Sequence, residues 1–161
     1  MRTYLEKEML QETLRGRIRY GCTSYPGMDG FNVFEVCIDG VQVKRFSLET
    51  VNTYFIENGY TQNKNPYGTR EYWEEFWELL SRYPLDQRTE YTDEEFAQAL
   101  EIYRNSDISD SIVSENPLVM MFAMLDRRIG KRTLLKIKEI VLNRPDWLYR
   151  FYDLRITSEN L

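Results

Sequence analysis

The Asp39-Gly40 pair constrains the fold of this 161-residue chain more than any other local feature. It separates two runs rich in β-branched and aromatic residues, 31–38 and 41–46. Asp-Gly is a preferred two-residue turn of a β-hairpin, because both central residues must adopt positive φ. The register that follows pairs Ile38 with Val41, Val36 with Val43, and Glu35 with Lys44. Since 17–22 alternates polar and apolar residues, the sequence predicts an antiparallel meander of three strands.

The segments on either side of the meander carry helical patterns. At the N-terminus, Thr3 and Glu6 have the spacing of a capping box, and Gly16 ends the pattern. After the meander, apolar residues recur at helical spacing in several segments. These segments open at Ser47, Thr69, Thr92, Pro117, Lys131 or Arg132, and Pro145. We therefore expect an α+β fold: an N-terminal helix, a three-stranded antiparallel β-meander, then a bundle of five to six helices.

Two of these helices carry predictions about individual residues. The helix that opens at Thr69 presents one apolar stripe, which at this spacing is more often core than a ligand-stacking surface. The stripe consists of Trp73, Phe76, Trp77 and Leu80. The helix that opens at Pro117 is expected to run to Ile129, where Gly130 ends it.

The length predicts a single domain over residues 1–161, with a helix and meander in 1–46 and a helical part in 47–161. No apolar run approaches the roughly 20 residues that cross a bilayer, and the first residues do not resemble a secretory signal. We therefore expect a soluble, cytoplasmic protein with no membrane partner. Two cysteines are too few for a disulfide framework and would be reduced in the cytoplasm.

The chain contains no histidine, which limits the kinds of catalytic and metal-binding sites that it can form. Histidine general bases, Cys–His and Ser–His–Asp nucleophile systems, and nearly all zinc and non-haem iron ligand sets are excluded. The glutamates of 71–78 are interpreted as a solvated helix face rather than metal ligands. We expect no catalytic residue, no metal and no cofactor. An enzyme with a carboxylate, arginine and tyrosine site is an alternative.

Charge is distributed unevenly along the chain. Residues 1–70 have a net charge of +1, residues 71–115 of −10, and residues 117–161 of +4. The acidic middle and the basic end could neutralise each other by packing, or could present two surfaces of opposite sign to partners. We expect packing, because helices of opposite charge in one small domain usually meet.

The densest basic cluster lies in residues 127–138. Its candidate binding residues are Arg127, Arg128, Lys131 and Arg132. They could bind a polyanion, in the manner of a nucleic-acid-associated regulator, or could cap a helix and pair with the acidic middle. Gly130-Lys131 does not form a phosphate-binding loop, because position 125 is leucine and Arg132 follows the lysine.

Three segments carry a resemblance to known proteins. Residues 14–20, 125–134 and 145–155 show the patterns LxGRIxY, LDRRxGKRTL and PxWLxxFYxLR. With these segments the chain resembles a family of short bacterial proteins of unknown function. The resemblance implies a bacterial, cytosolic protein that functions as one free-standing domain, and it assigns no catalytic or binding residue.

The leading hypothesis for function is a non-enzymatic intracellular domain that binds another protein. An acidic single domain could act as an inhibitor or immunity-type partner of a basic protein, with 71–101 as the contact face. The tyrosine-bearing segments 25–28 and 60–67 could also contact partners, because such loops on a rigid scaffold often do. A nucleic-acid regulator that uses 127–138 is the first alternative, and the enzyme described above is the second.

Overall fold

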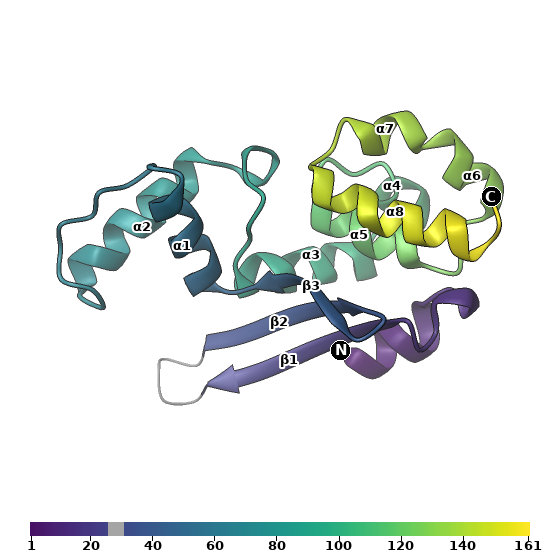
Figure 1. The fold of residues 1–161 in the computed structure, drawn as a ribbon, viewed down its shortest axis with the longest axis horizontal. Coiled ribbons are helices and arrows are strands. Elements are labelled where there is room, and N and C mark those ends of the chain that lie inside the picture. Colours follow the sequence, from purple (N-terminus) through teal and green to yellow (C-terminus); the bar gives the residue numbers. More distant parts are fainter. Residues whose placement is uncertain (26–30) are drawn as a thin grey trace.

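The structure, a computed structural model, describes residues 1–25 and 31–161 (Figure 1). A π-helical turn η1 (Tyr4–Met9) and a 3₁₀ turn η2 (Glu12–Leu14) precede the strands β1 (Ile18–Tyr25), β2 (Phe31–Ile38) and β3 (Val41–Phe46). The helices that follow are α1 (Leu48–Glu57), α2 (Arg70–Arg82), η3 (Leu85–Gln87), α3 (Asp93–Asn105), α4 (Ile108–Ser111), α5 (Pro117–Leu125), α6 (Lys131–Lys136), α7 (Lys138–Leu142) and α8 (Asp146–Ser158). The predicted α+β class is confirmed. Residues 26–28 of the predicted tyrosine turn lie outside the described residues.

The sheet has the order β1-β2-β3, and both pairs are antiparallel. Asp39 and Gly40 adopt φ of 50° and 83°, so the predicted hairpin turn is confirmed. The pair Ile38–Val41 is also confirmed, but the register shifts between Val36 and Cys37.

The pairs predicted for Val36 and Glu35 are therefore wrong by one residue: Val36 faces Lys44 and Glu35 faces Arg45. The cause is a β-bulge, in which one strand inserts an extra residue. The bulge turns Lys44 and Phe46 toward the interior, where both are buried. Opposite charges still face each other, because Arg45 replaces Lys44 opposite Glu35.

The capping box predicted at Thr3 is wrong, since its side chain makes no capping hydrogen bond. The Glu6 carboxylate instead accepts a hydrogen bond of 2.7 Å from the backbone N–H of Tyr20 in β1. The N-terminal segment consequently packs against β1 as two short turns in place of one regular helix. The caps predicted at Ser47, Thr69 and Thr92 are confirmed, and Thr92 forms a complete capping box with Glu95.

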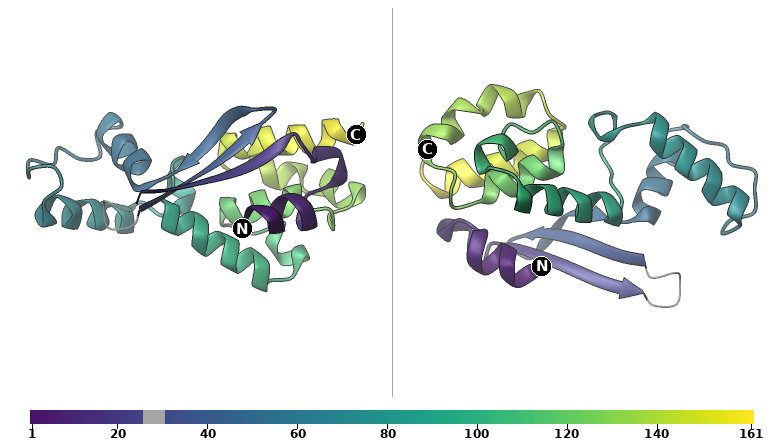
Figure 2. Two further views of the ribbon diagram at one scale, coloured as in Figure 1. Left: turned by 90° about the horizontal axis from the view of Figure 1, so that it is seen from below. Right: turned by 180° about the vertical axis from the view of Figure 1, so that it is seen from behind.

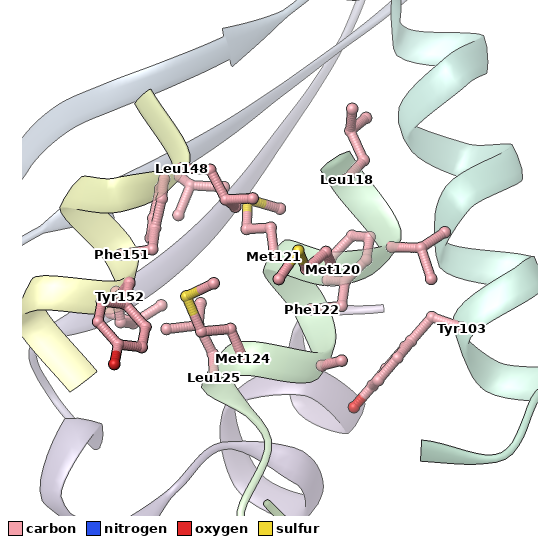
Figure 3. Packing of buried hydrophobic residues seen from close by; sticks show 14 of the residues in the cluster. Tyr103, Leu118, Met120, Met121, Phe122, Met124, Leu125, Leu148, Phe151 and Tyr152 are labelled. Carbon is pink, nitrogen blue, oxygen red and sulfur yellow. The ribbon is translucent and has the colours of Figure 1, made fainter. Parts of the chain in front are cut away.

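The main hydrophobic core lies between the sheet and the helices α3, α5 and α8 (Figures 1 and 2). Every residue of α5 is buried, and Figure 3 shows its side chains packed between Tyr103 of α3 and Leu148, Phe151 and Tyr152 of α8. The prediction that this helix reaches Ile129 is wrong. It ends at Leu125, because Asp126 takes an extended backbone conformation, and Gly130 serves as the N-cap of α6.

The helices α1 and α2 form a lobe with a hydrophobic cluster of its own, at the left of Figure 1. Its buried residues are Leu48, Val51, Phe55, Phe76 and Leu79. The stripe predicted for α2 is partly wrong: Tyr72, Phe76 and Leu79 are its buried residues, whereas Trp77 is 42% exposed. Within the described residues, no helix is both long and apolar enough to cross a membrane.

Candidate functional site

Two of the three segments that carry the family resemblance, 125–134 and 145–155, meet around one buried arginine. Arg155 of α8 is 0% exposed and donates hydrogen bonds to the carbonyls of Met124 (3.0 Å), Asp126 (2.9 Å) and Ile129 (2.6 Å). Its guanidinium also lies 3.4 Å from the buried Glu159 carboxylate. The backbone N–H of Gln11 donates to the carbonyl of Leu125, which brings the N-terminal segment to the same place. These contacts hold the polypeptide in position where α5 ends.

Asp126 organises the turn that follows α5. Its carboxylate accepts hydrogen bonds from the Tyr103 hydroxyl, from the backbone N–H of Arg128 (2.7 Å) and from the Arg128 guanidinium (2.6 Å). The hydrogen bond to Asp126 is the main cause that raises the pKa of Arg128 above its ordinary value. Arg128, a predicted binding residue, is therefore paired with a buried carboxylate of the same chain, although its side chain is 42% exposed.

The other three predicted binding residues, Arg127, Lys131 and Arg132, are exposed as well. Lys131 donates to the carbonyl of Glu159 at 3.3 Å. Across residues 1–25 and 31–161, no ion pair joins the acidic segment 71–115 to the basic segment 117–161. The two segments do pack on each other, as expected, where α3 contacts α5, but no ion pair neutralises their charges there. The helices α2 and α6 lie toward opposite ends of the molecule (Figure 1).

An aromatic hollow lies where the sheet meets the α1–α2 lobe. Its volume is ≈ 280 Å³, and β2, the start of α1, α2 and the loop before α2 contribute to its walls. The lining residues are Tyr25, Phe31, Asn32, Val33, Arg45, Ser47, Leu48, Glu49, Tyr67 and Trp73. Tyr67 is 63% exposed and meets Trp73 edge to face, with ring centroids 5.8 Å apart. We call this feature the aromatic hollow.

The loop that carries Tyr67 is held by side-chain hydrogen bonds to α2. Asn63 donates to the carbonyl of Tyr72 at 3.0 Å, and Thr61 donates to the Glu75 carboxylate at 3.0 Å. The backbone N–H of Asn65 donates to the Asn63 side chain at 3.1 Å. Because these polar residues hold the loop, Tyr67 is presented in a fixed place rather than on a free segment.

A buried lysine connects the sheet to the helices beside this lobe. The Lys44 ammonium donates to the carbonyl of Thr89, lies 3.2 Å from the Glu90 carboxylate and sits 5.1 Å from the centre of the Trp147 ring. Burial lowers the pKa of Lys44 despite the opposing effect of Glu90. Because the side chain is buried and its ammonium is engaged by Thr89 and Glu90, we interpret Lys44 as a structural clamp.

Sequence reasoning found part of this arrangement. The segment 60–67 was predicted to contact partners, and its Tyr67 does project into solvent at the hollow. Phe31 and Arg45 were missed, because they come from separate elements and no local spacing links them to the loop. Trp73 was interpreted as core, because it belongs to the apolar stripe of α2. Within residues 1–25 and 31–161, no group of three or more metal-ligating side chains could hold a metal ion.

The sequence profile of the SF0329 protein family matches residues 1–156. No curated protein and no solved structure matches the chain. The match spans all three segments that carried the resemblance. The chain belongs to the SF0329 protein family.

Proposed function

We propose that this member of the SF0329 family is a non-enzymatic protein-binding domain that acts in a bacterial cytoplasm and contacts its partner through the aromatic hollow. The observation that carries the proposal is the hollow itself: Tyr67 on a hydrogen-bonded loop and Trp73 on α2 meet at its wall, within a separately packed lobe. Tyrosine and tryptophan are enriched at interface hot spots. A rigid loop also loses less conformational entropy on binding than a free one.

The charge of the lobe indicates the chemistry of the partner. Residues 47–92 hold eight acidic and four basic side chains. Several of the acidic groups are engaged within the lobe, as in the pairs Arg70–Glu74 and Arg82–Glu78. Glu49, which lines the hollow, is exposed and forms no ion pair among the described residues. We therefore propose a partner segment that inserts an apolar side chain into the hollow and carries lysine or arginine residues on either side of that side chain. Inhibition of a basic protein fits this chemistry.

An enzyme would use one of two larger hollows: one of ≈ 650 Å³ between β3 and α1, lined by residues that include Lys44, Glu49 and Tyr54, or the cleft between the lobe and the helical body. This cleft measures ≈ 1010 Å³, and Arg88 and Glu95 line it. Arg88 is buried and donates to the carbonyls of Tyr83 and Glu90 as well as to the Glu95 carboxylate. Because its donors are already used by neighbouring protein groups, this pair serves as an internal support, and we favour binding over catalysis.

The test is selection of a randomised peptide-display library against the wild-type protein and against Tyr67→Ala. We expect enriched peptides to carry an apolar residue flanked by lysine or arginine, and to bind wild-type protein at least about tenfold tighter than the variant. Trp77→Ala is the matched control, since Trp77 is an exposed aromatic residue of the same lobe outside the hollow. Peptides that bind wild-type protein and Tyr67→Ala equally, or that lack basic residues, would contradict the proposal.

A further inference from the structure

A second surface, at the opposite end of the molecule from α2, concentrates positive charge. A hollow of ≈ 370 Å³ opens beside the N-terminal turns, and four of its seven lining residues are basic. They are Arg2, Lys7, Arg15 and Arg19. Glu6 is the one acid among the lining residues, and it is engaged by the Tyr20 N–H and by Arg2.

Backbone hydrogen bonds join this hollow to the basic segment predicted from the sequence. The N–H of Arg127 donates to the carbonyl of Met9 at 2.8 Å, and the N–H of Gln11 donates to the carbonyl of Leu125 at 2.9 Å. The Thr13 and Ser158 hydroxyls lie 3.0 Å apart. Residues 9–11 and 125–127 therefore lie side by side, and the basic segment 127–132 continues from the N-terminal turns that form the hollow, although more than one hundred positions separate the two in the sequence. We call the hollow and this segment together the basic end.

The charges of the basic end are available to a ligand. Lys7, Arg15 and Arg19 are exposed, as are Arg127 and Arg132. None of these five side chains takes part in an ion pair within the described residues.

We propose that the basic end binds the phosphodiester backbone of a nucleic acid. Most of its cations are guanidinium groups, whose planar fork of N–H donors matches two phosphate oxygens at once. A hollow with cationic walls can receive one phosphate group, and Arg127 and Arg132 extend the positive surface beyond it. This surface is separate from the aromatic hollow, so the inference does not depend on the proposed protein partner.

The geometry favours binding that is independent of base sequence. In a helix-turn-helix, a full recognition helix enters the major groove. Here α6 spans only Lys131–Lys136, and the residues between α5 and α6 are fixed by Asp126 and Arg155. A membrane surface is disfavoured, because an interfacial helix buries its apolar face in the lipid, whereas α6 buries its Leu134 in the protein core.

The experiment measures fluorescence anisotropy of labelled duplex DNA and labelled single-stranded RNA with the full chain, over a range of salt concentrations. We expect binding to at least one probe at about 50 mM salt, with an affinity that falls steeply as salt rises, because bound phosphates release counterions. The variant Arg15→Gln/Arg19→Gln should bind several-fold more weakly, and the slope of log affinity against log salt should drop by about 0.9 for each lost phosphate contact. Arg127→Gln/Arg132→Gln should behave in the same way.

The matched control is Lys64→Gln/Arg70→Gln, which removes two exposed cations from the α1–α2 lobe and should leave binding unchanged. Failure of wild-type protein to bind either probe would overturn the proposal, as would equal binding by the control and the basic-end variants. Inorganic phosphate and anionic phosphatidylserine vesicles are tested in parallel. Displacement of the nucleic acid by micromolar phosphate, or tighter retention by vesicles than by nucleic acid, would also overturn it.

Discussion

Replacement of Arg155 by methionine is expected to lower the free energy of unfolding by about 3–5 kcal/mol. The side chain is fully buried and donates to three carbonyls, those of Met124, Asp126 and Ile129. Each buried acceptor that loses its donor costs about 1 kcal/mol or more. The buried Glu159 carboxylate would also lose its cation, and a broken buried pair costs several times more than a surface pair.

Methionine retains most of the volume of arginine, so the loss would come mainly from hydrogen bonds and charge rather than from a cavity. The assay is urea unfolding followed by circular dichroism, which gives the free energy of unfolding directly. The control is Arg150→Met, since Arg150 is exposed on the same helix and should change stability by less than about 0.5 kcal/mol. The double variant Arg155→Met/Glu159→Leu should recover only part of the loss, because the three carbonyls still lack donors. A loss below about 1 kcal/mol for Arg155→Met would refute this reasoning.

Three further predictions concern other parts of the fold. Burial raises the pKa of Tyr20 and of Tyr103 above the ordinary value of about 10, so their contribution to stability is complete below pH 10 and is lost at higher pH, where the phenols of the unfolded chain ionise. The urea midpoint of unfolding should therefore fall as the pH rises above about 10, and less steeply in Tyr103→Phe. A midpoint that does not change with pH would contradict the burial of these two phenols. Thr92→Ala should cost about 1 kcal/mol in urea unfolding, because it removes the capping box of α3, and no loss would mean that the cap is dispensable. Phe55→Ala should lower the free energy of unfolding by about 3–5 kcal/mol and Trp77→Ala by less than about 1 kcal/mol, because Phe55 is buried and Trp77 is exposed. Equal losses would show that Trp77 does not lie on the exposed face of α2.

Features set by neighbouring residues could be predicted from the sequence. The Asp39-Gly40 turn needs only two residues that tolerate positive φ, and each confirmed cap needs one hydroxyl and the N–H groups that follow it. The β-bulge could not be predicted, because it depends on partners far along the chain. Lys44 turns inward toward Glu90 and Trp147, and nothing in the β3 sequence indicates those contacts.

The orientation of α2 is a second feature that the sequence alone did not predict. An apolar stripe predicts which residues of a helix can be buried. The element that packs against the helix then decides which of these residues are buried in the fold. Because α2 packs on α1 in a small lobe, Tyr72 is buried and Trp77 is not.

In the candidate sites too, local features could be predicted from the sequence, and features that depend on distant residues could not. The basic cluster 127–132 is visible in the sequence because its residues are contiguous. Its continuation through Lys7, Arg15 and Arg19 is not, since backbone pairing between 9–11 and 125–127 creates it. The ion pair of Arg128 with Asp126 likewise depends on the place where α5 ends.

Binding of a partner at the aromatic hollow is tested most directly with the three tryptophans of the chain as separate reporters. Trp73 lines the aromatic hollow, Trp77 lies on the same lobe outside it, and Trp147 packs beside Lys44. Each indole N–H gives its own signal in a ¹H–¹⁵N spectrum, so titration with a selected basic peptide reports which surface is occupied. We expect the Trp73 signal to shift progressively while the Trp77 and Trp147 signals stay in place. A saturable titration that moves Trp77 or Trp147 and leaves Trp73 unchanged would contradict binding at the aromatic hollow.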